Sequence, residues 1–459
     1  MKKRYTVQRK MIPVVALVFA LAAVVIGATI AYNRDRSVIS NVFEISDYRV
    51  EFSDTFQSPS NWLTGQTVPK EIKVTNRTNT PVVARVKLTE TWDSKDGMGL
   101  PLVGAQSNVR MAIVNYLENS GWTLDGTWWY SPVLQPGETS TSLITGVTLN
   151  EDADLGADWR YGGATYKLSA KAEVIQSELA ATEWHKKAVV SVSSIVSRAA
   201  ALGRILNDGY DFVRSDTKID MNGQDSDYYI HIDSESNTPV YMWLVDHTLY
   251  WYSDADDIYL TNGSENGTSW TGFYSGQMLF LKSLTGMRDF NTSRMKSMYE
   301  LFIYPKMTSL DGLETWDVSN VTNMHNMFYY GGGDGAVTDI SALSRWDVSN
   351  VTDMSYMFSG NNEIADVTAL SGWNVRNVSN FTNFMYRTAI DESICQLADW
   401  PIVFSGSTPS ISSMLYTLSK SPLLDGTCLE PWNVPETNGQ RTNVLNKSAF
   451  TLPTWAQWH

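Results

Sequence analysis

Two nearly identical stretches of thirteen residues constrain the fold of this chain more than any other feature. They read WDVSNVTNMHNMF at residues 316–328 and WDVSNVTDMSYMF at residues 346–358. Alignment of the flanking sequence on the tryptophan, which we call the pivot, shows six copies of one unit spaced 26 to 32 residues apart. The pivots are Phe290, Trp316, Trp346, Trp373, Trp400 and Trp432. A period of this length is typical of stacked repeat architectures.

Apolar residues recur at the same places in most copies. They occupy positions nine, six and three before the pivot and positions five, eight, eleven and twelve after it. The leading Leu-x-x-Leu segment predicts a short strand, and the spacing of three and four after the pivot predicts a helical turn. One copy has too few apolar side chains to offset the entropy of ordering its own backbone, so the copies must pack on one another. We therefore predict a β/α leucine-rich-repeat-like solenoid in which the pivots and methionines are core residues.

The repeats resemble the BspA-type leucine-rich-repeat surface proteins. The signature of that family is close to WDVSNVTDMSYMF, and the stretch PVYMWLVDHTLYWYSDADDIYL, which predicts paired strands, resembles its cap. The resemblance covers about residues 239–432. It implies a solenoid displayed outside the cell and used for adhesion to host matrix proteins, other cells or biofilm components. The insertion YYGGGDGAV at residues 329–337 departs from the pattern and is expected to bulge from one copy.

The N-terminus has the composition of an export signal. Five basic residues precede the apolar run MIPVVALVFALAAVVIGATIA, and Thr29 and Ala31 are small enough for the positions before a cleavage point. We place cleavage between Ala31 and Tyr32, with an uncleaved anchor helix over residues 11–31 as the alternative. Removing the five basic charges of residues 1–31 changes the formal net charge from −14 to −19. Because such a surface repels phosphate, we expect no nucleic-acid partner.

Several segments within residues 32–185 alternate strictly between apolar and polar residues. One face of PVVARVKLTETW carries Val82, Ala84, Val86, Leu88 and Trp92, and one face of YKLSAKAEV carries Tyr166, Leu168, Ala170, Ala172 and Val174. DYRVEF and KEIKVTN repeat the pattern, with turn-forming residues between these segments. A period of two with one polar side predicts antiparallel strands over a core, and hence a β-sandwich.

This part of the chain resembles the BsaA-type, SipW-dependent biofilm matrix proteins, which are relatives of TasA and camelysin. The similar stretches include GATIAY, FEISDYRVEF, MAIVNYLENSGW, LQPGETSTSLITGVTL and GATYKLSAKAEVIQ, in this order. The resemblance implies secretion through a dedicated signal peptidase of Gram-positive bacteria. It also implies a jelly-roll-like domain that assembles outside the cell.

The remaining boundaries follow from composition. Residues 186–238 begin with many helix formers and no proline, so we expect a helical connector of one or two helices. Residues 239–459 then contain the cap and the repeats. The C-terminal TLPTWAQWH lacks an LPxTG motif, which favours release or non-covalent retention over covalent wall anchoring.

Few residues suggest catalysis or metal binding. The five histidines are scattered without the one-turn spacing of a zinc hydrolase, and two cysteines cannot form a zinc site. Cys395 and Cys428 can form one bridge between the last copies or remain free buried thiols. The cluster Trp128, Trp129 and Tyr130 suits either a sugar site or a sheet core, and the acidic stretches NEDADLGAD and DADD are interpreted as turns rather than calcium loops.

Taken together, these patterns and the two family resemblances lead us to expect a secreted, non-enzymatic surface or biofilm-matrix protein, which the resemblance of residues 32–185 implies belongs to a Gram-positive bacterium. We expect no catalytic residue, cofactor or metal, and contact with a membrane only transiently through the signal peptide. The expected partners are extracellular proteins, biofilm polymers and further copies of the chain. Polar positions such as Asp317, Ser319, Asn320, Asp347, Ser349 and Asn350 are candidates for binding, although the same residues also suit turns and caps. The alternative is an extracellular hydrolase, either a camelysin-like metalloprotease or a glycan-active enzyme.

Overall fold

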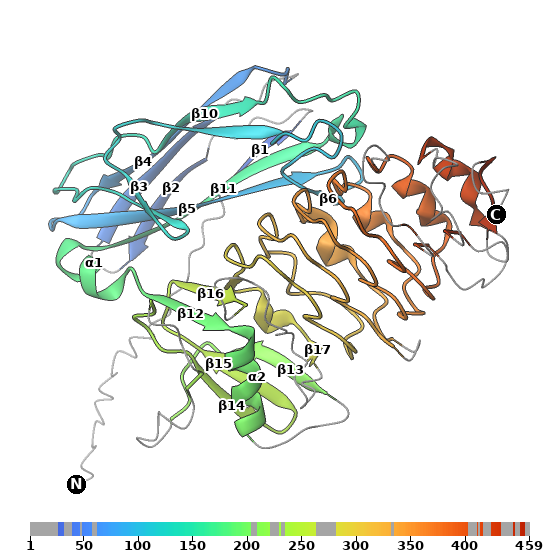
Figure 1. Ribbon diagram of the computed structural model, residues 1–459. Coiled ribbons are helices and arrows are strands. Elements are labelled where there is room, and N and C mark those ends of the chain that lie inside the picture. The colour runs from blue at the N-terminus through green and yellow to red at the C-terminus, as the bar shows by residue number, and fades with distance from the viewer. Residues whose placement is uncertain are drawn as a thin grey trace, which may run out of the picture.

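The computed structural model shows a β-rich, multidomain protein. Figure 1 shows the N-terminal sheets lying along one side of the C-terminal repeats, with strand β6 next to them. The described residues are 26–31, 39–45, 48–56, 62–202, 209–220, 229–230, 235–262, 281–331, 335–402, 411, 414–415, 424–432, 444–445 and 450–454. The basic and apolar parts of the expected export signal up to residue 25, and Tyr32, lie outside these residues.

The first N-terminal sheet has the strand order β1-β11-β5-β9-β8, and β6 also pairs with β5. Its strands are β1 (Ile26–Ala31), β11 (Thr165–Gln176), β5 (Val82–Asp93), β9 (Trp128–Tyr130), β8 (Thr123–Asp125) and β6 (Gly99–Leu100). The long pair β11 and β5 runs antiparallel from Thr165 opposite Asp93 to Gln176 opposite Val82. Strand β1 ends at Ala31, so cleavage after this residue would remove an edge strand from the sheet.

The second N-terminal sheet has the strand order β2-β3-β4-β10-β7. Its strands are β2 (Ile39–Ile45), β3 (Tyr48–Phe56), β4 (Thr67–Asn76), β10 (Ile144–Leu149) and β7 (Ala112–Tyr116). Apolar residues of β4 and β10 share one core with those of β5 and β11. The antiparallel strands predicted from alternation are therefore confirmed, because one side chain in two is directed into this core.

The region after the N-terminal sheets differs from the helical connector expected for residues 186–238. Two helices are present, α1 (Ser177–Glu183) and α2 (Val192–Ala201), but β12 (Lys187–Ser191) and β13 (Tyr210–Arg214) also lie here. Strand β12 runs parallel to β16 (Asp257–Thr261), and β13 runs parallel to β15 (Thr248–Tyr252). Buried residues of β12, α2 and β13 are therefore part of the same core as the repeats rather than of a spacer, whereas Ala180 of α1 packs in a separate cluster with Trp128 and Tyr130. Neither α1 nor α2 is long and apolar enough to cross a bilayer.

The expected paired strands of the cap are confirmed. Strand β14 (Tyr241–Val245) pairs antiparallel with β15, from Tyr241 opposite Tyr252 to Val245 opposite Thr248. Strand β17 (Leu281–Ser283) extends this sheet beside β13, and β18 (Phe290–Asn291) lies beside β16. The first copy of the repeat is thus joined directly to the two small sheets.

Parallel backbone bridges connect successive copies in the repeat region, which we define as residues 281–454. One row of bridges joins Ser297, Asn323, Asp353 and Asn380, each seven places after its pivot, and further bridges join Ser309 to Asp339 and Leu415 to Leu445. Five 3-10 helices lie close to the pivots. Four of them end before the pivot and one includes it: η3 (Thr285–Met287), η4 (Ser341–Arg345), η5 (Thr368–Leu370), η6 (Glu392–Leu397) and, including Trp432, η7 (Gly426–Trp432). Further along, β19 (Leu424–Asp425) runs parallel to β20 (Phe450–Thr451).

This arrangement corrects the predicted order of elements within each copy. The predicted strand is found only in part: β17, β19 and the bridge between Ser309 and Asp339 lie seven to nine places before their pivots. The residues six to three places before the pivot instead form a turn, which is a 3-10 helix in five of the six copies, and the segment after the pivot forms an extended bridge followed by a turn. The described residues of the repeat region contain no α-helix, so the β/α description does not hold for them. The physical reason is the backbone conformation ten places after the pivot, where φ is positive and helical hydrogen bonding is interrupted. In four successive copies this residue is Glu300, Asn326, Tyr356 and Asn383.

Candidate functional site

The pivots form a ladder of buried hydrogen bonds. Each indole Nε1–H donates to the carbonyl oxygen three places before the preceding pivot. The pairs are Trp316 to Met287 at 2.9 Å, Trp346 to Leu313 at 2.9 Å, Trp373 to Leu343 at 3.0 Å, Trp400 to Leu370 at 2.8 Å and Trp432 to Leu397 at 2.9 Å. A buried indole needs such an acceptor, so these tryptophans serve the interior. Phe290, the first pivot, has no N–H and packs on Trp251 with ring centroids 4.8 Å apart.

Most of the polar residues considered for binding are also committed to hydrogen bonds within the chain. The Asp317 carboxylate accepts from the Ser319 backbone N–H at 3.0 Å, and Asp347 accepts from that of Ser349 at 3.0 Å. The asparagines four places after the pivots donate to the preceding copy: Asn320 to the Ser293 carbonyl, Asn350 to that of Ser319 and Asn377 to that of Ser349. These side chains therefore form turns and a second ladder, as the alternative interpretation expected.

A row of half-buried aromatic side chains follows these ladders on the positions nine to fourteen places after the pivots. We call it the aromatic strip and define it as Tyr299, Tyr304, His325, Tyr329, Tyr330 and Tyr356. The strip draws on three successive copies, with pivots Phe290, Trp316 and Trp346. Sequence reasoning missed it, because it considered the apolar core positions and the polar residues one to four places after the pivot. The available signal was the tyrosine or histidine nine places after the pivots Phe290 and Trp316, where the next two copies have Ser355 and Thr382.

Ring contacts connect the six members of the aromatic strip without a break. His325 stacks on Tyr299 with centroids 5.0 Å apart, and it meets Tyr356 edge-on at 5.8 Å. Tyr329 contacts both Tyr356 and Tyr304 at 6.1 Å. The row ends where Tyr304 meets Tyr330 at 5.6 Å, with the Lys306 ammonium 5.9 Å from that last ring.

Backbone hydrogen bonds between copies hold the strip in place. The backbone N–H of Glu300 donates to the His325 carbonyl at 2.9 Å, and that of Asn326 donates to Ser355 at 3.0 Å. Beneath the strip, the rings of Phe302, Phe328 and Phe358 stack with centroids 5.6 and 5.5 Å apart. Regular bridges and a continuous phenylalanine stack fix the spacing of the aromatic rings above them, so the strip is a preformed surface.

His325 is the one titratable imidazole in the strip. Its Nδ1 lies 2.6 Å from the Ser355 hydroxyl, which in turn hydrogen bonds to the Asp353 carboxylate. Burial lowers the pKa of His325, although the nearby charges of Asp353 and Glu300 oppose this effect. Ser355 is only 1% exposed and its hydroxyl is bound to a carboxylate, so this group is not an accessible nucleophile.

The N-terminal part of the chain contacts a different part of three copies, those with pivots Trp346, Trp373 and Trp400, between four places before the pivot and three places after it. Arg345 donates to the Trp92 carbonyl at 2.7 Å and pairs with Asp93. Arg376 donates to the Gln106 carbonyl at 2.9 Å. Burial favours the neutral acid, but hydrogen bonds from Lys167 and Arg345 lower the pKa of Asp93 overall.

A second polar contact joins the N-terminal sheets to the cap. The Arg85 guanidinium lies between the rings of Trp128 and Trp184, 4.3 and 4.7 Å from their centroids, and pairs with Glu173 and Asp256. Burial by itself lowers the pKa of Arg85, but the charges of these two carboxylates outweigh this effect, so the pKa is raised overall. Two of the three aromatic residues considered for sugar binding, Trp128 and Tyr130, are thus buried in this junction.

The acidic stretches also have structural partners. In DADD, Asp257 accepts from the Thr127 hydroxyl at 2.8 Å, and Asp256 pairs with Arg85. In NEDADLGAD, Asp158 accepts from the backbone N–H groups of Gln106 and Ser107 at 2.7 and 2.8 Å. In the part of the chain that the structure describes, no group of three or more His, Cys, Asp or Glu side chains is placed to hold a metal ion.

Cys395 and Cys428 are joined by a disulfide with a Cα–Cα distance of 5.4 Å. The bridge links η6 to η7, and so ties the fifth copy to the sixth. Of the two possibilities that the sequence left open, the structure has the bridge.

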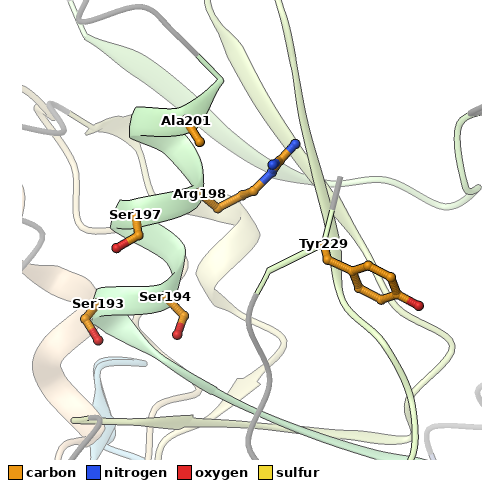
Figure 2. A pocket seen from close by; sticks show the side chains of 6 residues that line it. All are labelled: Ser193, Ser194, Ser197, Arg198, Ala201 and Tyr229. Atoms are coloured by element: carbon orange, nitrogen blue, oxygen red, sulfur yellow. The ribbon is translucent and has the colours of Figure 1, made fainter. Parts of the chain in front are cut away.

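A shallow cavity of about 400 Å³ lies beside α2 (Figure 2). Its lining residues are Ser193, Ser194, Ser197, Arg198, Ala201 and Tyr229. The hydroxyls of Ser193 and Ser194 lie 2.9 and 2.8 Å from that of Ser191, which caps the helix. Figure 2 shows the Tyr229 ring directed away from α2, so these groups do not converge on a common point. The aromatic strip is therefore the better candidate site.

Comparison with known proteins gives one match. The family described as "Mycoplasma protein of unknown function, DUF285" matches residues 296–420, which are 125 of the 459 residues and include the whole aromatic strip. Neither curated proteins nor solved structures showed a significant similarity to the chain.

Proposed function

We propose that this chain is a secreted bacterial surface or biofilm-matrix protein that acts by adhesion and assembly, without catalysis. The single observation that carries this proposal is that some positions of each copy form internal hydrogen bonds while others vary and stay partly exposed. Tryptophan and asparagine ladders recur from copy to copy and face other parts of the chain. The residues nine, ten, thirteen and fourteen places after the pivot change from copy to copy, and most of them are half-buried rather than part of the core. A constant scaffold with a variable face is typical of repeat proteins that bind partners.

In this proposal the repeats form a solenoid of the BspA type, and the N-terminal sheets form a β-sandwich of the TasA and camelysin type. Parallel bridges between copies and the continuous core support the first assignment. Two antiparallel sheets around one core support the second. The match to residues 296–420 is loosely consistent with a surface protein. The proposed location is the extracellular matrix or surface of a Gram-positive bacterium, after removal of the signal peptide.

The partners in this proposal are extracellular proteins, biofilm polymers and other copies of the chain. Immobilised full-length protein without the signal should retain bacterial cells, host matrix proteins or purified biofilm material above the level of an unrelated acidic protein. The same preparation should leave casein and glycan substrates intact, with or without chelator. Absence of retention on all three materials would refute the proposal, and so would substrate turnover that a chelator abolishes.

A further inference from the structure

The chain consists of two halves with separate apolar cores. The N-terminal half is residues 26–184, and the C-terminal half is residues 187–454. Among the described residues, no buried apolar cluster combines side chains of both halves. The backbone crosses from one half to the other once, between α1 and β12. Figure 1 shows α1 and β6 at opposite ends of the N-terminal sheets, so contacts near β6 lie far from the crossing.

Three side chains of the repeats donate hydrogen bonds to the N-terminal half near β6. The pairs are Arg345 to the Trp92 carbonyl oxygen at 2.7 Å, Asn374 to the Asn108 side chain, and Arg376 to the Gln106 carbonyl oxygen at 2.9 Å. Arg345 also pairs with Asp93, and these two side chains are 31% and 16% exposed, so water screens their charges only in part. We call this set of contacts the lock. Its strong members are charge-assisted hydrogen bonds rather than apolar packing.

Both arginines of the lock depart from the sequence of the repeat. Arg376 lies three places after its pivot, where the three preceding copies have serine. Arg345 lies one place before its pivot, where the preceding copy has threonine. The local turn does not need the Arg376 guanidinium, because the Arg376 backbone N–H donates to the Asn374 side chain at 3.2 Å, and serine makes the same bond in the two preceding copies. The repeat fold therefore does not account for these arginines, whereas contact with the N-terminal half does.

The copies with pivots Trp373 and Trp400 fit the N-terminal half in further ways. Gly372 lies one place before Trp373, and a Cβ there would lie 3.0 Å from Pro101, so the missing side chain lets the loop after β6 approach. In the next copy, Arg160 donates to the Gln396 carbonyl oxygen at 2.8 Å. The N-terminal half thus meets three successive copies around their pivots, mainly through polar groups.

We propose that Arg345, Asn374 and Arg376 are a docking site for the N-terminal half, and that this lock opens reversibly at the β6 end while both cores stay folded. Polar interfaces between the domains of one chain permit such relative motion. The contact of Arg85 with Asp256 lies beside the crossing and serves as the hinge. The closed form covers the outward side of β5 and the pivot region of three copies, and the open form exposes both. This inference is independent of the proposed adhesion.

The test uses the chain without its signal and a variant in which three lock positions take the residues of the copy with pivot Trp316. The substitutions are Arg345→Thr, Asn374→Asp and Arg376→Ser. The repeat already accepts these residues at these positions, so the variant should fold. A second variant adds Arg160→Ala.

Small-angle X-ray scattering reports the opening. The wild type should scatter as the closed arrangement. Each lost charge-assisted bond should shift the equilibrium from the closed to the open form by about tenfold or more. Both variants should therefore show a larger radius of gyration and a larger maximum dimension than the wild type, and the second variant should show the larger change.

The matched control combines Arg110→Ala with Arg288→Ala, which also removes two paired arginines. Arg110 pairs with Glu90 in the N-terminal half and Arg288 pairs with Glu314 in the repeats, so neither pair joins the halves. The control should scatter as the wild type. Hydrogen exchange of core peptides such as 82–92 and 346–358 should match the wild type in every variant.

Three results would overturn the proposal. The first is scattering of both lock variants that stays like that of the wild type, even in about 1 M NaCl, where the remaining ion pairs are screened. The second is expansion of the control as large as that of the lock variants. The third is loss of hydrogen-exchange protection throughout both cores when the lock is removed, because the halves would then be one cooperative unit.

Discussion

Replacing Trp373 by phenylalanine tests whether the indole ladder stabilises the repeats. Trp373 is fully buried, and its ring is stacked between those of Trp346 and Trp400, with centroids 6.5 Å away on each side. Its N–H donates to the Leu343 carbonyl at 3.0 Å. Phenylalanine keeps an aromatic ring at this position but removes the donor and part of the ring volume.

The expected cost can be worked out from three contributions. The Leu343 carbonyl also accepts from the Trp346 backbone N–H at 3.1 Å, so losing the indole does not leave it without a donor. The hydrogen bond therefore contributes about 1 kcal/mol. Loss of buried apolar area contributes about 1 kcal/mol at 25 cal/mol per Å². A residual void of a few tens of Å³ adds about 1 kcal/mol. We expect Trp373→Phe to lower the local stability by about 3 kcal/mol.

Hydrogen exchange measured by mass spectrometry is the appropriate assay, because a multidomain chain need not unfold in one step. Peptides from residues 339–400 should lose protection, whereas peptides from the N-terminal sheets should not. The control is Trp159→Phe, which also removes an indole donor, in this case to the Asp399 carboxylate at 2.6 Å. Trp159 is 52% exposed, so water replaces the lost bond and the cost should stay below about 1 kcal/mol. Equal effects of the two substitutions would refute the reasoning.

Three further predictions concern single features of the repeat region. Cys395→Ser should reduce protection of the peptide 426–432 by about 3–4 kcal/mol, as should treatment of the wild type with a reductant, because the bridge to Cys428 closes a long loop. Equal exchange in the reduced and oxidised protein would contradict this. Burial holds the pKa of His325 in the folded protein below its ordinary value of 6.5, because it disfavours the charged imidazolium. The neutral imidazole is therefore compatible with the folded state above pH 6.5, and protonation at lower pH costs folding free energy. Thermal stability should therefore fall as the pH drops through the lowered value, and His325→Gln should flatten that part of the profile. Gly312→Ala should lower the thermal midpoint sharply, with a loss of about 2 kcal/mol or more, because φ is +107° and a Cβ would lie 2.0 Å from the Leu284 carbonyl oxygen. A midpoint like that of the wild type would show that the backbone relaxes there.

Much of the N-terminal part could be read from the amino-acid sequence. Alternation in PVVARVKLTETW and YKLSAKAEV indicated antiparallel strands, and these segments pair along their whole length as β5 and β11. The signal is reliable there because a strand with one buried face must place an apolar residue at every second position. Composition was a weaker guide for residues 186–238, where the helix formers predicted α2 but not β12 and β13, which are short strands paired with partners distant in sequence.

The candidate site was harder to predict. Its rings lie at positions whose residue type changes from copy to copy, so no periodic pattern marks them. Only the stacking of three copies brings Tyr299, His325 and Tyr356 into one row. Conversely, Asp317 and Asn320 looked available in the sequence, but their side chains are used by a turn and by the neighbouring copy.

The sequence by itself determined the period of the repeat, the identity of the pivots and the alternating strands, because each of these depends on where apolar side chains recur along the chain. The tertiary structure decided which carbonyl each indole meets and which face the N-terminal sheets cover. It also decided that a left-handed residue replaces the expected helical turn after the pivot. These features depend on hydrogen bonds and contacts between copies about thirty residues apart or between distant segments, and no local pattern of residue types specifies those partners.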